Sequence, residues 1–304
     1  MISHEARAGG VKPEMRPRTA LVTGVGGPSG IAATAALKAR GFTVTAVDMH
    51  VVPHAADLFR QVPPVVDPGY LPVLREIIAA REIAWLVPTI SEELTAVAET
   101  AAELRSAGVA VYVGEPRAVR ICADKWDTAR ALQAAGIAVP PSAIGGPDSA
   151  EVRSLGFPRV SRPRVGRGGR GVVVHDGPGV APAAGEPVWQ QFMPGTEYDV
   201  MMVVRSDRPR EPVVVEVFEK KILKEGRVGN ALEVEPADAA DVARLAREAA
   251  AAIGLHGPMD IDIRRDASGR PRVLEINARI GAHTLKAPRV FDSLIGLFRE
   301  GQLG

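Results

Sequence analysis

The chain has 304 residues, which is long enough for two or three domains around a sizeable buried core. Hydrophobic residues make up 46% and charged residues 24%, and the formal net charge of +1 with 4% aromatic residues gives no reason to expect a nucleic-acid partner. The single cysteine, Cys122, excludes an internal disulfide and a cysteine-clustered zinc site. Residues 1–17 mix charges and glycines and are expected to form a mobile tail, and no run approaches the roughly 18 apolar residues of a membrane span. We therefore expect a cytoplasmic protein with no membrane partner.

Residues 18–115 alternate short β-rich runs with amphipathic patterns of about a dozen residues. Strands are predicted at residues 19–25, 42–48, 83–89 and 109–114, and helices at 29–41, 70–82 and 91–108. Because this alternation is typical of βαβ units, we predict an α/β domain with a parallel, doubly wound sheet.

The loop after the first predicted strand reads VTGVGGPSGIA and opens a helix. Gly24, Gly26 and Gly30 resemble a loosely spaced dinucleotide fingerprint, with Asp48 at the end of the next strand. Such a loop would place a phosphate at the helix N-terminus, as in an NAD(P)-dependent oxidoreductase. A tight turn between strand and helix would need glycines in any case, and no tyrosine has the lysine four residues later that a short-chain dehydrogenase requires. The oxidoreductase is kept as an alternative.

The pattern changes to α+β in the second part of the chain. Helices are predicted at residues 124–136 and 238–255. FPRVSRP and RGVVVHD are predicted as paired strands, and longer alternating strands follow in PVWQQFMPGTEYDVMMVV and EPVVVEVFEKKIL. MDIDIRRDASGRPRVLEINA is predicted to form an antiparallel hairpin that turns at Asp266–Gly269. We therefore predict antiparallel sheets here.

A second glycine loop, SRPRVGRGGRGV, combines glycines with arginines between two predicted strands. Glycine N–H groups can form anion-binding nests, and arginines supply positive charge around them. The residues concerned are Gly166, Gly168, Gly169, Gly171, Arg162, Arg164, Arg167 and Arg170. A solvated hairpin tip is the alternative interpretation. Lys125, at a predicted helix start, is positioned to reach the same anion.

The segment VLEINARIG alternates polar and apolar side chains, so Glu275, Asn277 and Arg279 would share one face of a strand. A half-exposed strand of ordinary polarity would show the same pattern. Asp262 precedes Glu275 by 13 residues on the other arm of the hairpin, so the two strands could bring Asp262, Glu275 and Asn277 together. Oxygen ligands of this kind suit Mg²⁺. Asp260, on the same face as Asp262, is an alternative first ligand.

Taken in order, Lys125, FPRVSRP, the second glycine loop, WQQFMPGTE, GPMDIDIRRD and VLEINAR resemble the ATP-grasp superfamily over about residues 15–304. The resemblance is strongest to the carbamoyl-phosphate-synthetase-like branch, which includes the pyrrolysine-pathway ligase. It implies a pre-ATP-grasp domain over 18–115, a small lid subdomain over 116–187 and a large subdomain with the metal hairpin over 188–304. ATP would lie between the two subdomains.

The resemblance also implies roles for individual residues. The nucleotide would be bound by Lys125, Arg162, Gly168, Gly169, Gly171, Gln191, Phe192, Met193 and Glu197. Arg162 occupies a position where the family more often has lysine, and Glu197 would bind the ribose. Mg²⁺ or Mn²⁺ would be bound by Asp262, Glu275 and Asn277. The catalytic residues would be Arg279, Arg162 and Lys125.

The activity implied is that of an ATP-dependent carboxylate–amine ligase that forms an acyl phosphate and releases ADP. Its partners would be a small-molecule carboxylate and a small-molecule amine, and a homodimer is compatible with the family. An ATP-grasp protein without ligase activity is a second alternative.

Several residues are weaker candidates for the substrate pocket, namely His283, Thr284, Asn230, Glu92 and Glu93. Lys220 and Lys221 are predicted to lie on a solvated strand edge, and Cys122 is predicted to pack in the interior.

Overall fold

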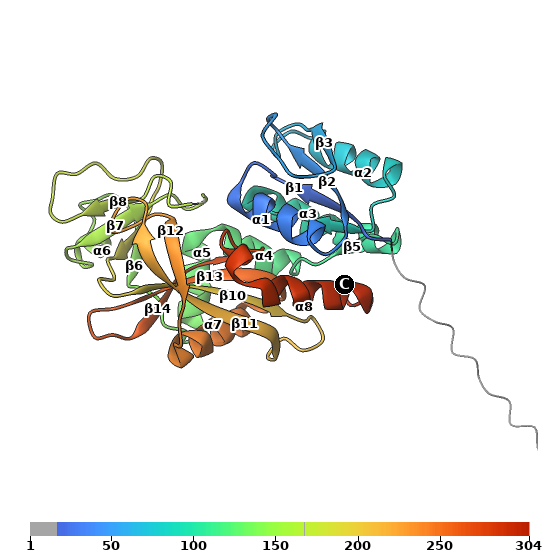
Figure 1. Cartoon of the computed structure of the whole chain (residues 1–304). Helices are drawn as coiled ribbons and strands as arrows, with labels where there is room; N and C mark the ends of the chain where they lie inside the picture. Colours follow the sequence, from blue (N-terminus) through green and yellow to red (C-terminus); the bar gives the residue numbers. More distant parts are fainter. Residues whose placement is uncertain (1–16, 167, 304) are drawn as a thin grey trace, which may run out of the picture.

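The computed structural model describes residues 17–166 and 168–303, and three β-sheets organise them (Figure 1). Residues 1–16 of the predicted tail, together with Arg167 and Gly304, lie outside the described residues. In Figure 1 the four-stranded sheet (green to yellow) and the first domain (blue) lie at opposite sides of the view. The C-terminal helix, in red, lies beside the first domain.

The first sheet is parallel and has the strand order β3-β2-β1-β4-β5, which confirms the predicted doubly wound domain. Its strands are β1 (Thr19–Thr23), β2 (Thr43–Asp48), β3 (Leu58–Gln61), β4 (Trp85–Val87) and β5 (Ala110–Val111). The helices are α1 (Pro28–Lys38), α2 (Tyr70–Ala80), η1 (Ser91–Glu93) and α3 (Leu94–Ser106). The strand order reverses between β1 and β4, and ligands of open α/β sheets bind at the carboxyl edge of such a switch point.

Two helices, α4 (Pro116–Ala123) and α5 (Lys125–Ala134), lead into a four-stranded antiparallel sheet. Its strand order is β6 (Ser142–Ile144), β9 (Val188–Gln191), β7 (Arg159–Arg162) and β8 (Val173–His175), and α6 (Ala150–Arg153) lies beside it. Asp124 caps α5 by accepting hydrogen bonds from the N–H groups of Trp126 and Asp127, so Lys125 opens the helix. Because β9 pairs with β6 and β7, we propose that the small subdomain extends to Gln191.

The large sheet is antiparallel, with the strand order β12-β11-β10-β13-β14. Its strands are β10 (Glu197–Val204), β11 (Pro212–Leu223), β12 (Ala231–Pro236), β13 (Gly257–Arg265) and β14 (Pro271–Asn277). The helices of this part are α7 (Ala240–Ile253), η2 (Thr284–Lys286) and α8 (Pro288–Arg299). β13 and β14 form the predicted hairpin, closed by a hydrogen bond from Asp266 N to Arg270 O at 2.8 Å.

The two faces of the large sheet differ because successive side chains of a strand point to opposite sides. Along β10, Val200 and Met202 share a buried cluster with residues of α7, whereas Met201 and Val203 share another with residues of α8. Glu197 and Asp199 belong to the same face as Met201 and line the cavity described below. The apolar side chains thus anchor the sheet in the core. The polar side chains on the cavity face form a polar strip, made of Glu197, Asp199, Asp260, Asp262, Glu275 and Asn277.

Some elements differ from the sequence predictions. The strand predicted at 109–114 is paired only over β5, and PVWQQFMPGTEYDVMMVV forms two strands, β9 and β10, in different sheets. Pro194 interrupts that run because it lacks the N–H needed for a β-ladder. The short elements β3, α4, β6, α6 and β12 were not predicted. Within the described parts of the chain, no helix has the length and apolar character needed to cross a membrane.

Candidate active site

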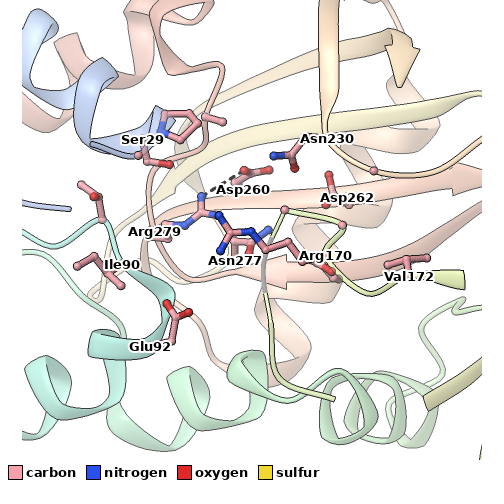
Figure 2. A pocket seen from close by; sticks show the side chains of 18 of the residues that line it. Ser29, Ile90, Glu92, Arg170, Val172, Asn230, Asp260, Asp262, Asn277 and Arg279 are labelled. Carbon is pink, nitrogen blue, oxygen red and sulfur yellow. Dashed lines mark hydrogen bonds and ion pairs between the residues drawn. The ribbon is translucent and has the colours of Figure 1, made fainter. Parts of the chain in front are cut away.

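One cavity of about 590 Å³ is bounded by all three parts of the molecule. The first domain contributes the loops that follow β1, β2, β3 and β4, at the carboxyl edge of its sheet. The small subdomain contributes the second glycine loop and the end of β9, and the large subdomain contributes the polar strip of its sheet. Figure 2 shows side chains from these parts directed toward a common space.

The hairpin of β13 and β14 places four oxygen-bearing side chains on the cavity face. Asp262 pairs directly with Glu275, and Asp260 pairs directly with Asn277. Directly opposed residues of an antiparallel pair are close neighbours on the same face of the sheet. The alternation read from the sequence therefore brings together the predicted metal ligands Asp262, Glu275 and Asn277, and it adds Asp260.

Glu275 is bound by the two cations that were predicted to meet the phosphates. Arg162 of β7 donates to its Oε2 atom, and Lys125 Nζ lies 3.7 Å from the same oxygen. Although burial acts in the opposite direction, these two cations lower the pKa of Glu275 to about 2. Lys125 Nζ also donates to Gly166 O at 2.7 Å, so this lysine joins α5, the glycine loop and the metal hairpin.

Lys220 was predicted to lie on a solvated strand edge, and that prediction is wrong. Its side chain is only 6% exposed, and its Nζ donates to Glu197 at 2.8 Å and to Asp262 at 2.5 Å. Against the effect of burial, these carboxylates raise the pKa of Lys220 well above its ordinary value. The signal lay in the alternation of β11, which places Lys220 and Lys221 on opposite faces.

Glu197, predicted to bind a ribose, lies on the cavity wall among charged partners. Besides Lys220, it accepts from Arg264 Nη1 at 3.2 Å. Arg264 stacks over the ring of Phe192, with 4.8 Å between its guanidinium carbon and the ring centroid. The predicted nucleotide residues Gln191, Phe192 and Met193 line the cavity next to this group.

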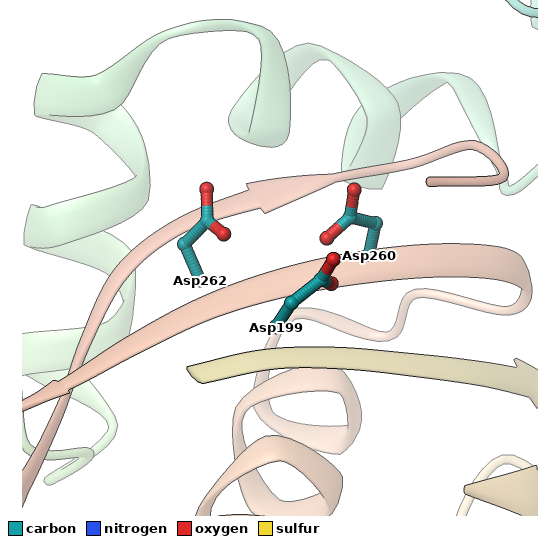
Figure 3. Close-up of side chains that lie close together, drawn as sticks. All are labelled: Asp199, Asp260 and Asp262. Atoms are coloured by element: carbon teal, nitrogen blue, oxygen red, sulfur yellow. The ribbon is translucent and has the colours of Figure 1, made fainter. Parts of the chain in front are cut away.

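Three aspartates form an acidic cluster on the polar strip (Figure 3). Carboxylate oxygens of Asp199, Asp260 and Asp262, one from each, lie within 4.8 Å of one another. Burial and the neighbouring Asp199 raise the pKa of Asp260 well above its ordinary value. Asp199, which sequence reasoning missed, accepts from His283 Nδ1 at 3.0 Å, and His283 lines the cavity as predicted. Asp199 follows Glu197 by two residues in β10, so strand alternation places both on the same face and could have revealed Asp199.

Arg279 connects the metal hairpin to the first domain. Its Nη1 lies 3.5 Å from Asp260 Oδ2 (Figure 2). Its Nε donates to Ser91 Oγ at 3.4 Å. A further bond from Nη1 to Ile280 O at 2.7 Å fixes the guanidinium. Arg279 is therefore a cation on the same side of the sheet as Asn277, as the sequence predicted.

The second glycine loop lies over this strip. Gly168, Gly169 and Gly171 have φ values of +66°, +68° and +73°, a region that favours glycine. A Cβ atom on Gly169 would lie 2.5 Å from Gly229 Cα, in the turn between β11 and β12. Asn230 of the same turn lines the cavity, in agreement with its prediction as a pocket residue. The loop is thus in backbone contact with the large subdomain.

Two of the weaker candidates do not face the cavity. Glu93 is fully buried, where it accepts from Thr23 Oγ1 at 2.5 Å and from the Tyr70 hydroxyl, so its prediction as a substrate contact is wrong. Thr284 is also buried, and its hydroxyl donates to Gly281 O at 2.6 Å, so it is not a pocket residue either. Glu92 does line the cavity. Cys122 packs against the buried core, and burial raises the pKa of its thiol to about 12.

Sequence comparison agrees with this geometry. A family model of the ATP-grasp domain matches residues 122–283, which include the small sheet and the metal hairpin. The chain belongs to the ATP-grasp family. A second family model, described as the PylC-like N-terminal domain, matches residues 20–112. No curated protein sequence matches the chain.

Three solved structures share the fold. The L-amino acid ligase from Bacillus licheniformis superposes with a TM-score of 0.70 at 19% identity, covering 91% of this chain and 70% of that one. The biotin carboxylase from Campylobacter jejuni superposes with a TM-score of 0.68 at 16% identity, covering 94% of this chain and 71% of that one. The N5-carboxyaminoimidazole ribonucleotide synthetase from Thermotoga maritima superposes with a TM-score of 0.58 at 20% identity, covering 86% of this chain and 68% of that one. At these identities the similarity establishes the fold, which is the predicted one.

Proposed function

We infer that this ATP-grasp protein is an ADP-forming ligase that joins a small-molecule carboxylate to a small-molecule amine through an acyl phosphate. The observation that carries this proposal is the cavity between the three parts, which is lined by Asp262, Glu275, Asn277, Arg162 and the glycine loop. Lys125 and Arg162 both contact Glu275 beside it. Anionic and amide oxygens suit a divalent ion, and cations with loop amides suit phosphates. The L-amino acid ligase among the structural relatives supports the same reaction class.

The residues present fit a Mg²⁺ or Mn²⁺ ion. Asp262, Glu275 and Asn277 offer hard oxygen donors on one face, and each acidic donor already lies beside a cation that a nucleotide phosphate could recruit. A bound ion would supply positive charge against the nucleotide phosphates. Lys125 and Arg162 would bind the phosphate oxygens, and the N–H groups of the glycine loop would cover them.

The substrate carboxylate would be activated beside Arg279. A free carboxylate resists attack by an amine because oxide is a poor leaving group, whereas an acyl phosphate loses phosphate readily. Transfer of the γ-phosphoryl group to the carboxylate breaks the bond to ADP and forms the acyl phosphate. The amine then attacks the acyl carbon, loses a proton and expels phosphate. Arg279 would stabilise the oxygens of the transferred group, and the glycine loop would exclude water.

A thermal-shift titration tests the nucleotide assignment. We expect stabilisation by Mg-ATP and none by NAD⁺ or NADP⁺, because the phosphate-binding cations lie beside the metal hairpin. A ligand at 100 times its Kd adds about 2.7 kcal/mol to the free energy of unfolding, which a melting curve resolves readily. Stabilisation by NAD(P) alone would restore the oxidoreductase alternative, which the family membership does not favour.

Phosphate release tests the ligase reaction. The purified protein is incubated with Mg-ATP and pairs of carboxylates and amines, including a broad amino-acid panel, and products are identified by mass. We expect at least one pair to stimulate release, and Glu275→Gln to lower that rate by roughly 100-fold or more with its circular dichroism unchanged. Wild-type turnover in Glu275→Gln would contradict the metal assignment, and a failure of every pair would contradict the ligase.

A further inference from the structure

The first glycine loop, which the ligase reaction leaves unexplained, opens onto the same cavity. Its glycines have structural reasons to be there. Gly24 has a φ of +59°, and a Cβ atom on it would lie 2.6 Å from Ile90 Cγ1. A Cβ atom on Gly30 would overlap the carbonyl oxygen of Gly24. Packing of the turn from β1 into α1 therefore explains these glycines, and a ligand would be recognised by the N–H and hydroxyl groups at the start of α1.

The start of α1 presents hydrogen-bond donors that the rest of the described chain does not use. Its N-cap, Gly27, has no side chain that could accept hydrogen bonds from the N–H groups of the first turn, and Pro28 has no N–H. Among residues 17–166 and 168–303, neither the backbone N–H groups of Ser29 and Gly30 nor the Ser29 hydroxyl has a hydrogen-bond partner. Ser29 is only 8% exposed, yet it lines the cavity and is seen at its edge in Figure 2.

Asp48, which a dinucleotide would need on its ribose, is already engaged within its own loops. Its Oδ2 accepts from Gly26 N at 3.0 Å and its Oδ1 accepts from His50 N at 3.1 Å. These bonds leave the donors of Ser29 and Gly30 available. Three converging donors at a helix N-terminus, where the helix dipole is positive, favour an anionic group.

The surroundings restrict the kind of anion. The carboxylates of Asp48 and Glu92 line the same end of the cavity, and Arg279 lies between this end and the metal hairpin in Figure 2. A ligand that is only anionic, such as inorganic phosphate, would be repelled by these carboxylates. A zwitterion that presents its carboxylate to the helix and its ammonium to an acidic side chain is complementary to both.

From these observations we propose that the N-terminus of α1 binds the carboxylate of an amino acid, which is the amine substrate of the ligase. This inference rests on the proposed function and narrows its substrate class. Ser29 is then a specificity-determining residue, because it supplies both a hydroxyl and a backbone N–H group. Amines without a carboxylate would lack this contact and would be poor substrates.

Kinetics of Ser29 variants provide the first test, with each stimulating amino acid compared with its decarboxylated amine. Ser29→Asp places a negative charge among the donors, and we expect the KM for the amino acid to rise about 10-fold or more with an unchanged Kd for Mg-ATP. Ser29→Ala keeps the backbone donors and should give a smaller rise. Ser106→Asp, an exposed change on α3, is the matched control and should leave KM unchanged. An unchanged KM in Ser29→Asp would overturn the inference.

Amide NMR shifts of the deuterated, Mg-ADP-bound protein separate this inference from the ligase proposal. We expect amino acids, but not their decarboxylated amines, to shift the N–H resonances of Ser29 and Gly30. Shifts without phosphate release would support the subsite and refute the ligase. Phosphate release stimulated by amino acids that leave both resonances in place would refute the subsite alone. Equal shifts from the amines, or a shift caused only by NAD⁺, would also overturn the subsite.

Discussion

At the scale of single residues, charge pairing decides which polar side chains are part of the site. Lys220 and Lys221 are neighbours in sequence, yet the Lys220 side chain is 6% exposed and the Lys221 side chain 39%. Strand alternation directs one to the acidic strip and the other to solvent. A buried ammonium is tolerated because Glu197 and Asp262 both accept from it, and either carboxylate without it would be a buried, incompletely paired charge.

Lys220→Met should therefore destabilise the protein by about 3–5 kcal/mol, because it removes one partner of a buried ion pair. The matched variant Lys221→Met should change the free energy of unfolding by no more than about 0.5 kcal/mol. Urea denaturation followed by circular dichroism measures both. Similar stabilities of the two variants would contradict the buried position of Lys220.

The ionisation of Asp262 predicts a pH dependence of metal binding. Burial, opposed by Lys220, raises the pKa of Asp262 to about 6, whereas Glu275, with a pKa of about 2, stays ionised in the same range. A metal ligand must be deprotonated, so we expect the affinity for Mn-ADP to fall about 10-fold between pH 7.5 and pH 5. Calorimetric titration measures the affinity of wild type and of Asp262→Asn. The difference between the two pH profiles isolates Asp262, because the nucleotide's own protonation contributes equally to both. Parallel pH profiles of the two proteins would contradict the prediction.

The raised pKa of Asp262 also affects the free energy of unfolding, which it lowers as the pH rises, whereas metal affinity increases with pH. Because the pKa of Asp262 in the folded chain lies above its ordinary value of 3.8, the folded state holds this proton more tightly than the unfolded state. Its contribution to stability is full below the ordinary value and is lost as the pH rises through about 6. Asp262→Asn should remove this part of the pH dependence of unfolding.

At the scale of elements, the second glycine loop and the β11–β12 turn meet through their backbones. A Cβ atom on Gly169 would lie 2.5 Å from Gly229 Cα, so Gly169 has no room for a side chain, and Arg227 of the turn pairs with Asp176 after β8 at 2.7 Å. The glycines of the loop are therefore required by close approach as well as by backbone conformation. This contact sets the position of the loop over the cavity.

Gly169→Ala should lower turnover about 10-fold or more, because a methyl group at φ +68° would both strain the backbone and push the loop from Gly229. Gly146→Ala, in the same subdomain, has no atom within 4 Å of the added Cβ and should behave as wild type. Phosphate-release assays with a stimulating substrate pair measure both variants. Equal turnover would show that loop position does not matter for catalysis.

At the scale of the whole molecule, the first domain is anchored to the large subdomain through α8. Phe298 of α8 stacks on Trp85 of β4, with ring centroids 5.2 Å apart, and contacts Phe42 at 5.5 Å. Arg40 adds an ion pair to Asp292 at 2.7 Å. The cavity needs walls from both parts, so this apolar contact helps to define its shape.

Phe298→Ala should cost about 3–5 kcal/mol of unfolding free energy, because it leaves a void between Trp85, Phe42 and the helix. Leu285→Ala, at a 56% exposed position, is the control and should have little effect. Thermal unfolding followed by tryptophan fluorescence and by circular dichroism measures the loss. A Phe298→Ala protein as stable as wild type would show that α8 does not anchor the first domain.

Local patterns predicted most of the fold and part of the site. The alternation of strands and helices over residues 18–115 gave the parallel sheet, and the hairpin was located with its turn. The proximity of Asp262, Glu275 and Asn277 was predicted because strand alternation and hairpin pairing relate residues that are close in sequence. Short elements such as β3 and β6 were missed because few residues carry their signal.

The sequence alone determined the fold class, the β13–β14 hairpin and the glycine loops, because periodicity and turn chemistry act between near neighbours. Only the tertiary structure placed Lys220 against Asp262, 42 residues away, and Arg279 against Ser91, 188 residues away. It also showed that the donors of α1 open onto the cavity that holds the metal hairpin. These facts depend on how whole sheets and helices pack, and no local pattern encodes which distant charges share a buried, poorly solvated space.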